Sequence, residues 1–372
     1  MAMAFFPIQV YIFNIYLASF AFYQLTPLLF QNELWFKRNE KEECKSDPKI
    51  HNKYKEIMST IPRRDGGWVV DLCQYEGFWC GAHDLRGILS VQDQFTPQPN
   101  DVILSSAPKF GTTWLKALSF AIMTRFHFNE STGPLLIRLA YDCVPYLEFK
   151  LSSNSQKMDL DVPLVAIHIP YTSLPKSVMN SSCKIVYICR DPKDVFVSLW
   201  HFSNKFSPKG MEATPMKEIH LRDAFEFFCE GLSIFGPYWD HVLGYWRASL
   251  ESPKRILFLK YEDLKNKTIY WVKEIAQFIG YPFSLKGEEK SVVQKIINLC
   301  SFEKLSSLEV NTSGIIQVGA IVSKAKTNAF FRSGKVGDWK NHLTPTMAMR
   351  LDQITEQKLS DSGLTLHVSS KG

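Results

Sequence analysis

The amino-acid sequence predicts an α/β fold, a single domain in which a central parallel sheet is flanked by helices. Four apolar runs rich in β-branched residues have the length of buried strands. Helical patterns alternate with these runs, which is typical of parallel sheets, because their crossover connections are helices. The predicted strands cover about residues 102–107, 164–168, 184–189 and 255–260.

Three helical patterns lie between these strands. Residues 114–125 follow the first strand, residues 195–202 follow the third, and residues 225–247 form one long aromatic-rich stretch before the fourth. The helical spacing of that stretch indicates core packing rather than a ligand site. The chain holds no linker rich in Pro, Gly or Ser and no internal repeat. Residues 51–372 are therefore predicted to form one domain of about 320 residues, after a hydrophobic leader and polar linker over residues 1–50.

The leader is the unusual part of the chain. Residues 1–32 contain no charged side chain and are long enough to span a membrane. They lack the basic start and the small-residue cleavage site of a secretory signal. Three interpretations stay open: a signal anchor, a partly buried extra helix, or a translated upstream stretch that is absent from the mature protein. The first cations, Lys37, Arg38 and Lys41, follow this stretch, so an anchor would leave the domain in the cytosol.

Charge and cysteine content exclude some classes of protein. The net charge is +6, from 43 basic and 37 acidic residues, which suits an anionic nucleotide but not a nucleic-acid binder with a clustered basic face. The eight cysteines include no C-x-x-C pair, and several lie in apolar segments, as reduced thiols do in cytosolic proteins. We therefore expect a cytoplasmic protein that binds no nucleic acid, with membrane anchoring through residues 1–32 as the alternative.

A candidate anion site follows the first predicted strand. Residues 105–116 read SSAPKFGTTWLK, in which a tight loop with Lys109 and Gly111 leads through Thr112 and Thr113 into a helix. Unpaired N–H groups and the helix dipole at such a helix start favour an anion. The Walker order G-x-x-x-x-G-K-S/T is missing, so a triphosphate with magnesium is not the first expectation. A plain strand–turn–helix connection is the structural alternative.

A second strand–loop–helix unit repeats this pattern. Arg190 stands at the carboxyl end of a predicted strand, where open α/β sheets bind ligands, and Ser198 lies about one helical turn beyond Asp194. The structural alternative pairs Arg190 with Asp194 and makes Asp191 the helix cap. A third segment, residues 330–341, carries two glycines and three cations within nine residues. It suits a loop that closes over an anion, or else an ordinary solvated turn.

His168 is the candidate general base. It ends an apolar run, so its ring is expected at the carboxyl edge of the sheet, and an imidazole can take a proton near neutral pH. A histidine in such a place is also common as a structural residue. The other histidines in helical patterns, His127, His201 and His241, are expected at the surface or in packing.

Together these segments resemble the cytosolic sulfotransferase family, and most closely its plant, flavonol sulfotransferase-like members. Residues 105–116 are similar to the family motif Y-P-K-S-G-T-T-W, residues 190–198 to R-N/D-P-K-D-V-x-V-S, and residues 332–341 to R-K-G-x-x-G-D-W-K-N. The resemblance covers about residues 54–367. Further similarity lies in residues 77–79, 143–148, 168–175 and 261–264.

The resemblance implies the P-loop-nucleotide-binding-like sulfotransferase fold. It also implies transfer of a sulfuryl group from 3′-phosphoadenosine 5′-phosphosulfate (PAPS) to a hydroxyl of a small plant metabolite, without a metal. The acceptor class stays open among flavonoids, steroids, jasmonates and desulfoglucosinolates. His168 is the implied base, and Lys109 the cation that neutralises the leaving oxygen. The implied donor-binding residues are Lys109, Gly111, Thr112, Thr113, Trp114, Arg190, Ser198, Tyr261, Phe302, Arg332, Ser333 and Gly334.

Four departures from the family pattern predict a working but weaker donor site. Phe110 replaces a serine, Ile167 a threonine or serine before the base, Cys300 a threonine, and Ser333 a lysine. The alternative is a catalytically weakened or inactive paralogue that only binds nucleotide. A P-loop kinase of a small molecule and a membrane-anchored Golgi sulfotransferase are more distant rivals. The oligomeric state stays open, because the mammalian-type motif K-x-x-x-T-V-x-x-x-E is absent from the carboxyl end.

Overall fold

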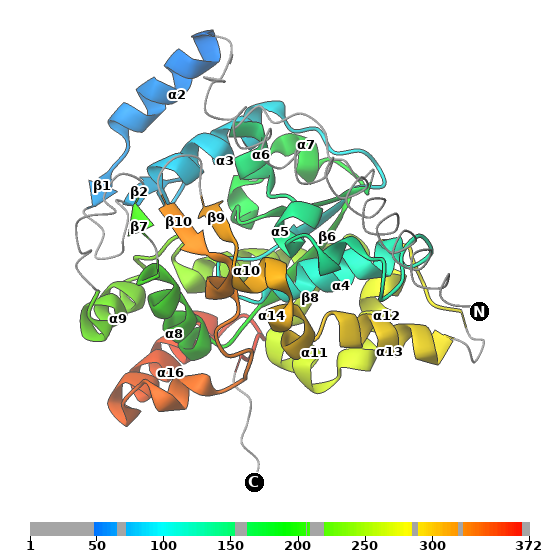
Figure 1. Cartoon of the computed structure of the whole chain (residues 1–372). Coiled ribbons are helices and arrows are strands. Elements are labelled where there is room, and N and C mark those ends of the chain that lie inside the picture. The colour runs from blue at the N-terminus through cyan, green and yellow to red at the C-terminus, as the bar shows by residue number, and fades with distance from the viewer. Residues whose placement is uncertain are drawn as a thin grey trace, which may run out of the picture. The chain divides into compact units, whose positions relative to one another are not determined.

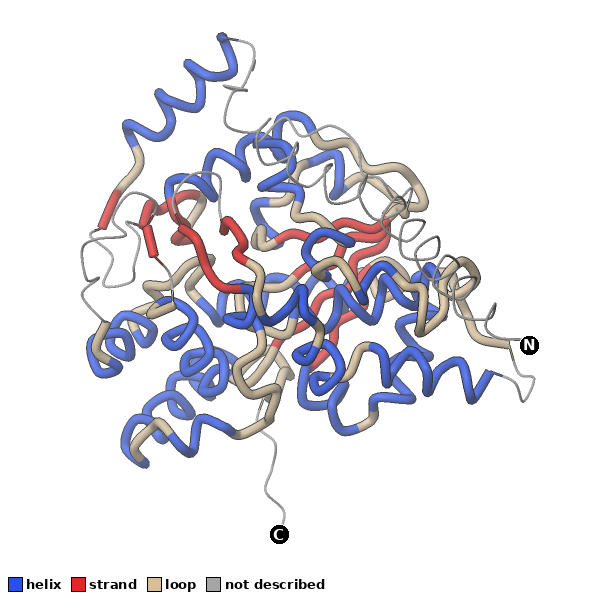
Figure 2. Tube along the Cα trace, in the orientation of Figure 1, coloured by secondary structure: helices blue, strands red, loops and turns tan. Residues whose placement is uncertain are grey.

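Four parallel strands form the central sheet, in the order β5–β4–β6–β8. The computed structural model describes residues 48–64, 72–152, 162–205, 207–208, 219–284, 289–318 and 323–366. The sheet lies among helices in Figures 1 and 2. The predicted fold class and all four predicted strands are confirmed. The strands are β4 (Val102–Ser105), β5 (Leu164–Ile167), β6 (Lys184–Cys189) and β8 (Ile256–Lys260).

The two faces of the sheet are covered by different helices. Val186 and Ile188 of β6 belong to a buried apolar cluster that includes α4, α12 and α13. Tyr187, which alternates with them along the strand, stacks on Tyr245 of α10, with ring centroids 4.2 Å apart. A strand that is apolar on both faces therefore forms the middle of a three-layer arrangement, as its continuous hydrophobic run predicts.

Shorter strands form two further sheets. One has the order β1–β2–β3 and the other the order β7–β10–β9, and all their pairings are antiparallel. These strands are β1 (Arg63–Arg64), β2 (Leu72–Tyr75), β3 (Phe78–Gly81), β7 (Ser207–Pro208), β9 (Ile315–Val318) and β10 (Ser323–Lys326).

The described α-helices are α2 (Pro48–Thr60), α3 (Ala82–Gln94), α4 (Thr112–Thr124), α5 (Ala140–Cys143), α6 (Leu147–Ser152), α7 (Lys176–Met179), α8 (Pro192–Ser203), α9 (Leu221–Cys229), α10 (Tyr238–Glu251), α11 (Tyr261–Asn266), α12 (Thr268–Ile279), α13 (Glu289–Leu299), α14 (Phe302–Ser307), α15 (Glu309–Thr312) and α16 (Pro345–Leu359). Short 3₁₀ turns are η1 (Pro134–Leu136), η2 (Tyr171–Ser173), η3 (Thr327–Phe330) and η4 (Asp338–Asn341).

The prediction of one long helix over residues 225–247 is wrong. Helix α9 ends at Cys229 and α10 begins at Tyr238, with a loop between them. Gly231 has a left-handed backbone, φ +83°, and Pro237 lacks the N–H that a continuing helix requires. The loop instead pairs with β3, since the Phe235 N–H donates to the Trp79 carbonyl at 2.7 Å. This pairing places the Phe235 ring against the ring of His168.

The leader lies outside the described residues. Residues from Asn52 onward form one compact unit, and α2 is the first described element. No helix of the described ranges combines the length and the apolar character that crossing a bilayer requires. The boundary near residue 50 and the nature of residues 1–32 stay predictions.

Candidate active site

The carboxyl ends of three neighbouring strands bring the candidate residues together. Ser105 of β4 aligns with Ile167 of β5 and with Tyr187 of β6. The chain therefore leaves the three strands at one edge of the sheet, where ligands of parallel α/β proteins bind. His168 follows β5 and Arg190 follows β6 at this edge. The loop that carries Lys109 follows β4.

The Lys109 loop has a backbone that only a glycine allows at its end. Gly111 caps α4 with φ +111°, and a Cβ atom there would come within 2.6 Å of the Tyr261 ring. Thr112 begins the helix, and its Oγ1 hydrogen bonds to Ser106 Oγ at 2.5 Å. Thr113 follows in the first turn, where backbone N–H groups have no intrahelical acceptor. The loop and the helix start thus have the backbone geometry that an anion site requires, and the binding of an anion there stays a prediction.

Lys109 lies among other cations. Its Nζ is 3.9 Å from the centroid of the Phe202 ring and 5.7 Å from that of Phe330. Burial, followed by repulsion from Arg190, Arg332 and other cations, lowers the pKa of Lys109 to about 7. Concentrated positive charge of this kind favours binding of an anion, whose presence would restore the lysine pKa.

Arg190 makes the contacts that the sequence analysis gave as the structural alternative to phosphate binding. Its Nη2 lies 3.3 Å from the Asp194 carboxylate and donates to the Lys335 carbonyl at 2.8 Å, and Asp191 caps α8. Arg332 pairs with Asp338 through one terminal nitrogen. In the described part of the chain, the Nε atoms of both arginines are buried without a hydrogen-bond partner. Two unpaired guanidinium donors fit a phosphate group, since a buried unpaired donor is costly.

Asp194 has a role that sequence reasoning missed. Its side chain is fully buried, and its two oxygens accept hydrogen bonds from the Gly337 N–H at 2.8 Å and the Trp339 N–H at 3.0 Å. One carboxylate therefore fastens the glycine-rich carboxyl-terminal loop to the start of α8. These partners are more than 140 positions away in the chain, so no local pattern could reveal the contact.

Replacing Asp194 with Asn is expected to weaken binding of 3′-phosphoadenosine 5′-phosphate (PAP) about tenfold. The amide keeps one acceptor but loses the charge and the second acceptor, and hydrogen bonds to charged groups are worth about 1.5–3 kcal/mol. Isothermal titration of PAP into the full chain measures the change. Asp361→Asn, at an exposed position, is the matched control. Equal affinity of Asp194→Asn and wild type would contradict this role of the loop anchor.

The predicted adenine-binding side chains are linked by a continuous series of contacts. Trp114 packs edge-on against Tyr261, with centroids 5.5 Å apart, and the Tyr261 hydroxyl donates to the Gly334 carbonyl at 3.3 Å. Gly334 in turn lies so close to the Phe302 ring that a Cβ atom would clash with it. α4, α11, α14 and the carboxyl-terminal segment therefore form one cluster, and its role in binding adenine stays a prediction.

Two of the residues predicted to bind PAPS have weaker structural support. Ser198 is buried on α8, and Ser333 lies partly exposed beside Arg332. Within the described ranges neither hydroxyl makes a hydrogen bond, so both are free to meet a phosphate oxygen. Their roles stay predictions.

His168 is held by three hydrogen bonds. Its Nδ1 lies 2.5 Å from the Ser106 carbonyl, its backbone N–H donates to Glu148 Oε1 at 2.6 Å, and its carbonyl accepts from His241 Nε2 at 3.0 Å. A carbonyl partner requires a proton on Nδ1, so Nε2 carries the lone pair. In the described part of the chain no group hydrogen bonds to that Nε2. The ring thus has the tautomer that a general base needs.

Two aromatic rings enclose the imidazole. The Tyr146 and Phe235 rings have centroids 4.3 and 5.3 Å from that of His168. Burial, the largest cause, lowers the pKa of His168 to about 3, and the nearby Lys116 ammonium contributes. The histidine is therefore neutral across the physiological pH range. His241, expected at the surface or in packing, is fully buried and helps to position it.

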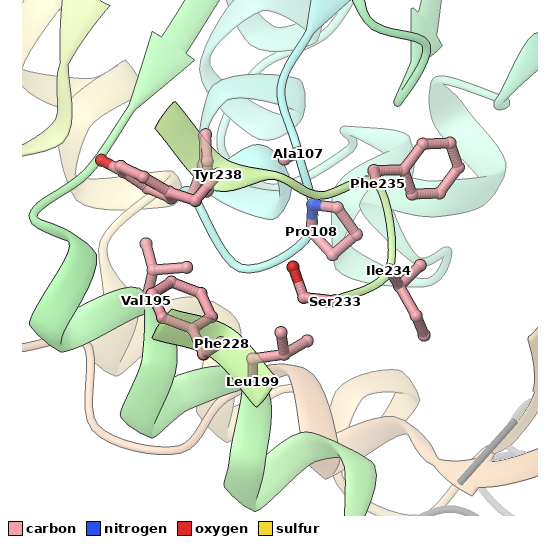
Figure 3. Close-up of a pocket in the computed structure, with 10 residues that line it drawn as sticks. Ala107, Pro108, Val195, Leu199, Phe228, Ser233, Ile234, Phe235 and Tyr238 are labelled. Atoms are coloured by element: carbon pink, nitrogen blue, oxygen red, sulfur yellow. The ribbon is translucent and has the colours of Figure 1, made fainter. Parts of the chain in front are cut away.

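Phe110, the largest departure from the family motif, points into the core. Its ring is 1% exposed and packs on Tyr238 of α10 at a centroid distance of 5.2 Å. Beside it lies a cavity of about 10 Å³, between the Lys109 loop and the residue 233–238 loop (Figure 3). The cavity has room for about one water molecule, so it is too small for an acceptor. Phe110 replaces the usual serine without filling the candidate phosphate site.

Comparisons with known proteins find sulfotransferases. A family model described as a sulfotransferase domain matches residues 99–363. A flavonol sulfotransferase-like protein of Flaveria bidentis is 47% identical over 84% of this chain and 99% of its own length, and cytosolic sulfotransferase 16 of Arabidopsis thaliana is 44% identical over 86% and 94%.

Solved structures show the same fold. A crystal structure from Arabidopsis thaliana, assigned as a steroid sulphotransferase, is 35% identical, with a TM-score of 0.65, and the match covers 88% of this chain and 99% of that one. A mouse sulfotransferase complexed with PAP has a TM-score of 0.56 at 24% identity, over 78% and 96% of the two chains. With the family motifs at one sheet edge, these matches show that the chain belongs to the sulfotransferase family.

Proposed function

We propose that this protein transfers the sulfuryl group of PAPS to a phenolic hydroxyl of a flavonol-type acceptor, with His168 as general base. One observation carries the proposal. At the same edge of the sheet, His168 has an Nε2 without a hydrogen-bond partner in the described part of the chain, and Lys109 lies near other cations. The 45% identity to flavonol 3-sulfotransferase of Flaveria bidentis supports the acceptor class, as does the 47% identity to the flavonol sulfotransferase-like protein of the same plant.

The donor has two separated phosphate groups, and the chain offers a cation group for each. Lys109 and the start of α4 would hold the 5′ side, including the bridging oxygen to sulfur. Arg190, Arg332 and Ser198 would hold the 3′-phosphate, where the arginine Nε atoms would gain the acceptors they lack. The adenine would lie in the aromatic cluster of Trp114, Tyr261 and Phe302.

The proposed reaction is one in-line displacement at sulfur. His168 Nε2 takes the acceptor hydroxyl proton while the acceptor oxygen forms its bond to sulfur. The bond from sulfur to the 5′-phosphate oxygen breaks, and PAP leaves with the electron pair. Lys109 stabilises the negative charge that develops on that oxygen. The donor's negative charge raises the pKa of the neighbouring histidine, so its basicity increases in the complex.

The pKa shifts give an unusual pH profile. A His168 pKa lowered to about 3 keeps the base neutral, so kcat/KM for PAPS is not expected to fall between pH 8 and pH 5, where an ordinary histidine becomes charged. A Lys109 pKa lowered to about 7 means that the cation is lost as pH rises through 7, so kcat/KM for PAPS is expected to fall on the alkaline side. Initial rates from pH 5 to 9 test both limbs. An acid limb near pH 6.5 would contradict the assignment of His168.

Incubating the full chain with PAPS and a flavonol tests the proposed function. Mass spectrometry is expected to find the sulfated flavonol and an equal amount of PAP. A steroid, a hydroxyjasmonate and a desulfoglucosinolate serve as parallel acceptors, and preferential transfer to one of them would overturn the flavonol assignment. PAP binding without transfer to any acceptor would instead support the nucleotide-binding paralogue. The names of the Arabidopsis relatives support the cytoplasmic location, which stays part of the proposal.

A further inference from the structure

Two ionisable side chains are buried behind the candidate base. Glu148, in α6, has no exposed side-chain surface, and Lys116, in α4, is 2% exposed. Glu148 Oε1 accepts the backbone N–H of His168 at 2.6 Å. The other carboxylate oxygen and Lys116 Nζ are buried and have no hydrogen-bond partner in the described part of the chain.

Lys116 and His168 contact the same aromatic ring. Lys116 Nζ lies 3.1 Å from the Tyr146 ring centroid, and the imidazole centroid lies 4.3 Å from it. Burial, the largest cause, raises the pKa of the Glu148 carboxyl to about 8 and lowers the pKa of Lys116 well below its usual range, and the charge of each group opposes the shift of the other. Carboxylate, ammonium, phenol ring and imidazole therefore form one buried cluster, which we call the Glu148 cluster.

Stability alone does not account for the Glu148 cluster. Removing two charges from water costs more than their attraction returns unless the geometry is excellent, and apolar residues of similar size are often as stable or better. Here each charge also leaves one polar atom without a partner. The contact that the carboxylate does make is to the residue that carries the base. The arrangement thus favours a role in placing that residue.

We propose that Glu148 is a positioning residue for His168, through the carboxyl oxygen that accepts the His168 backbone N–H. The inference rests on the proposed role of His168 as base. The imidazole is fixed on one side by Ser106, through Nδ1, and its backbone is fixed on the other side by Glu148. Without the second contact, this peptide keeps the longer hydrogen bond from the Ser106 N–H to the Ile167 carbonyl at 3.3 Å. A misplacement of about 1 Å can still cost about 100-fold in rate.

Two matched double variants isolate this contact. Glu148→Gln with Lys116→Met removes both charges but keeps an amide oxygen for the His168 N–H. Glu148→Leu with Lys116→Met removes both charges and the acceptor as well, at similar side-chain volume. The first is expected to keep kcat within about threefold of wild type, and the second to lose about 10- to 100-fold. PAP affinity is expected to stay within about twofold in both, since no donor residue changes.

A purely structural role would give a different result. It predicts that both doubles change kcat and PAP affinity in parallel with thermal stability. Equal kcat in the two folded doubles would overturn the inference. Should the leucine double not fold, Glu148→Asp keeps both charges and withdraws the carboxylate from the N–H by one methylene. It is expected to show the same selective loss of kcat, and wild-type kcat in this variant would also overturn the inference. A wild-type chain without turnover would overturn the proposed function and this inference together.

Discussion

Replacing His168 with Ala is expected to lower kcat by about 10²- to 10⁴-fold, the range that a general base contributes. Its Nδ1 is held by the Ser106 carbonyl, and Nε2 is the ring nitrogen without a hydrogen-bond partner in the described part of the chain, so removal of the ring takes away the proton acceptor. PAP affinity is expected to change little, because His168 is not among the residues proposed to hold PAP. Steady-state rates together with PAP titration separate the two quantities.

His127→Ala provides the matched control, since this side chain is exposed and follows the carboxyl end of α4, whereas the Lys109 loop precedes its start. It is expected to have wild-type rates. A His168→Ala enzyme with more than one tenth of the wild-type kcat would show that the acceptor loses its proton to another group. In that case the buried histidine would be a structural residue, as its apolar surroundings also allow.

Replacing Lys109 with Met is expected to lower kcat/KM for PAPS by about 10²- to 10³-fold, as loss of one oxyanion-stabilising group does in other enzymes. The same change is expected to raise the thermal unfolding temperature. Burial and the neighbouring Arg190 and Arg332 lower the pKa of this lysine, so the folded protein holds the cation at a cost. Activity and stability should therefore move in opposite directions.

Rates and thermal unfolding of Lys109→Met are compared with those of Lys273→Met, an exposed substitution on α12. The control is expected to change neither. A Lys109 variant that loses stability along with activity would mean that the lysine mainly packs the loop, through its contact with the Phe202 ring. A variant with unchanged kcat/KM would remove Lys109 from the mechanism.

The central sheet was predictable because its strands are buried on both faces. Such strands read as continuous apolar runs, and all four lie where these runs stand. The prediction of a helix over residues 225–247 failed because it relied on the hydrophobic periodicity of this segment. It gave too little weight to two helix-breaking residues, Gly231 and Pro237. The error matters for function, since the loop formed there brings Phe235 against His168.

The candidate site was predictable where its chemistry lies in short segments. His168 and Arg190 each stand directly after a strand, and Lys109 lies in the short loop after a third, so all three come to the same sheet edge. Asp194 and Glu148 could not be found in this way. Each acts through backbone N–H groups of a segment far along the chain, at Gly337, Trp339 and His168, and sequence patterns carry no record of such contacts.

The most direct test of the account is calorimetric titration of PAP into the full chain, beside Arg190→Ala and the exposed Arg350→Ala. Arg190 holds the loop carbonyl of Lys335 and has a buried Nε without a partner in the described part of the chain, whereas Arg350 pairs with Glu226 at the surface. The account predicts binding at about micromolar level or tighter for wild type and Arg350→Ala, and a loss of about 100-fold or more for Arg190→Ala. Absence of PAP binding by folded wild type, or wild-type affinity in Arg190→Ala, would contradict it.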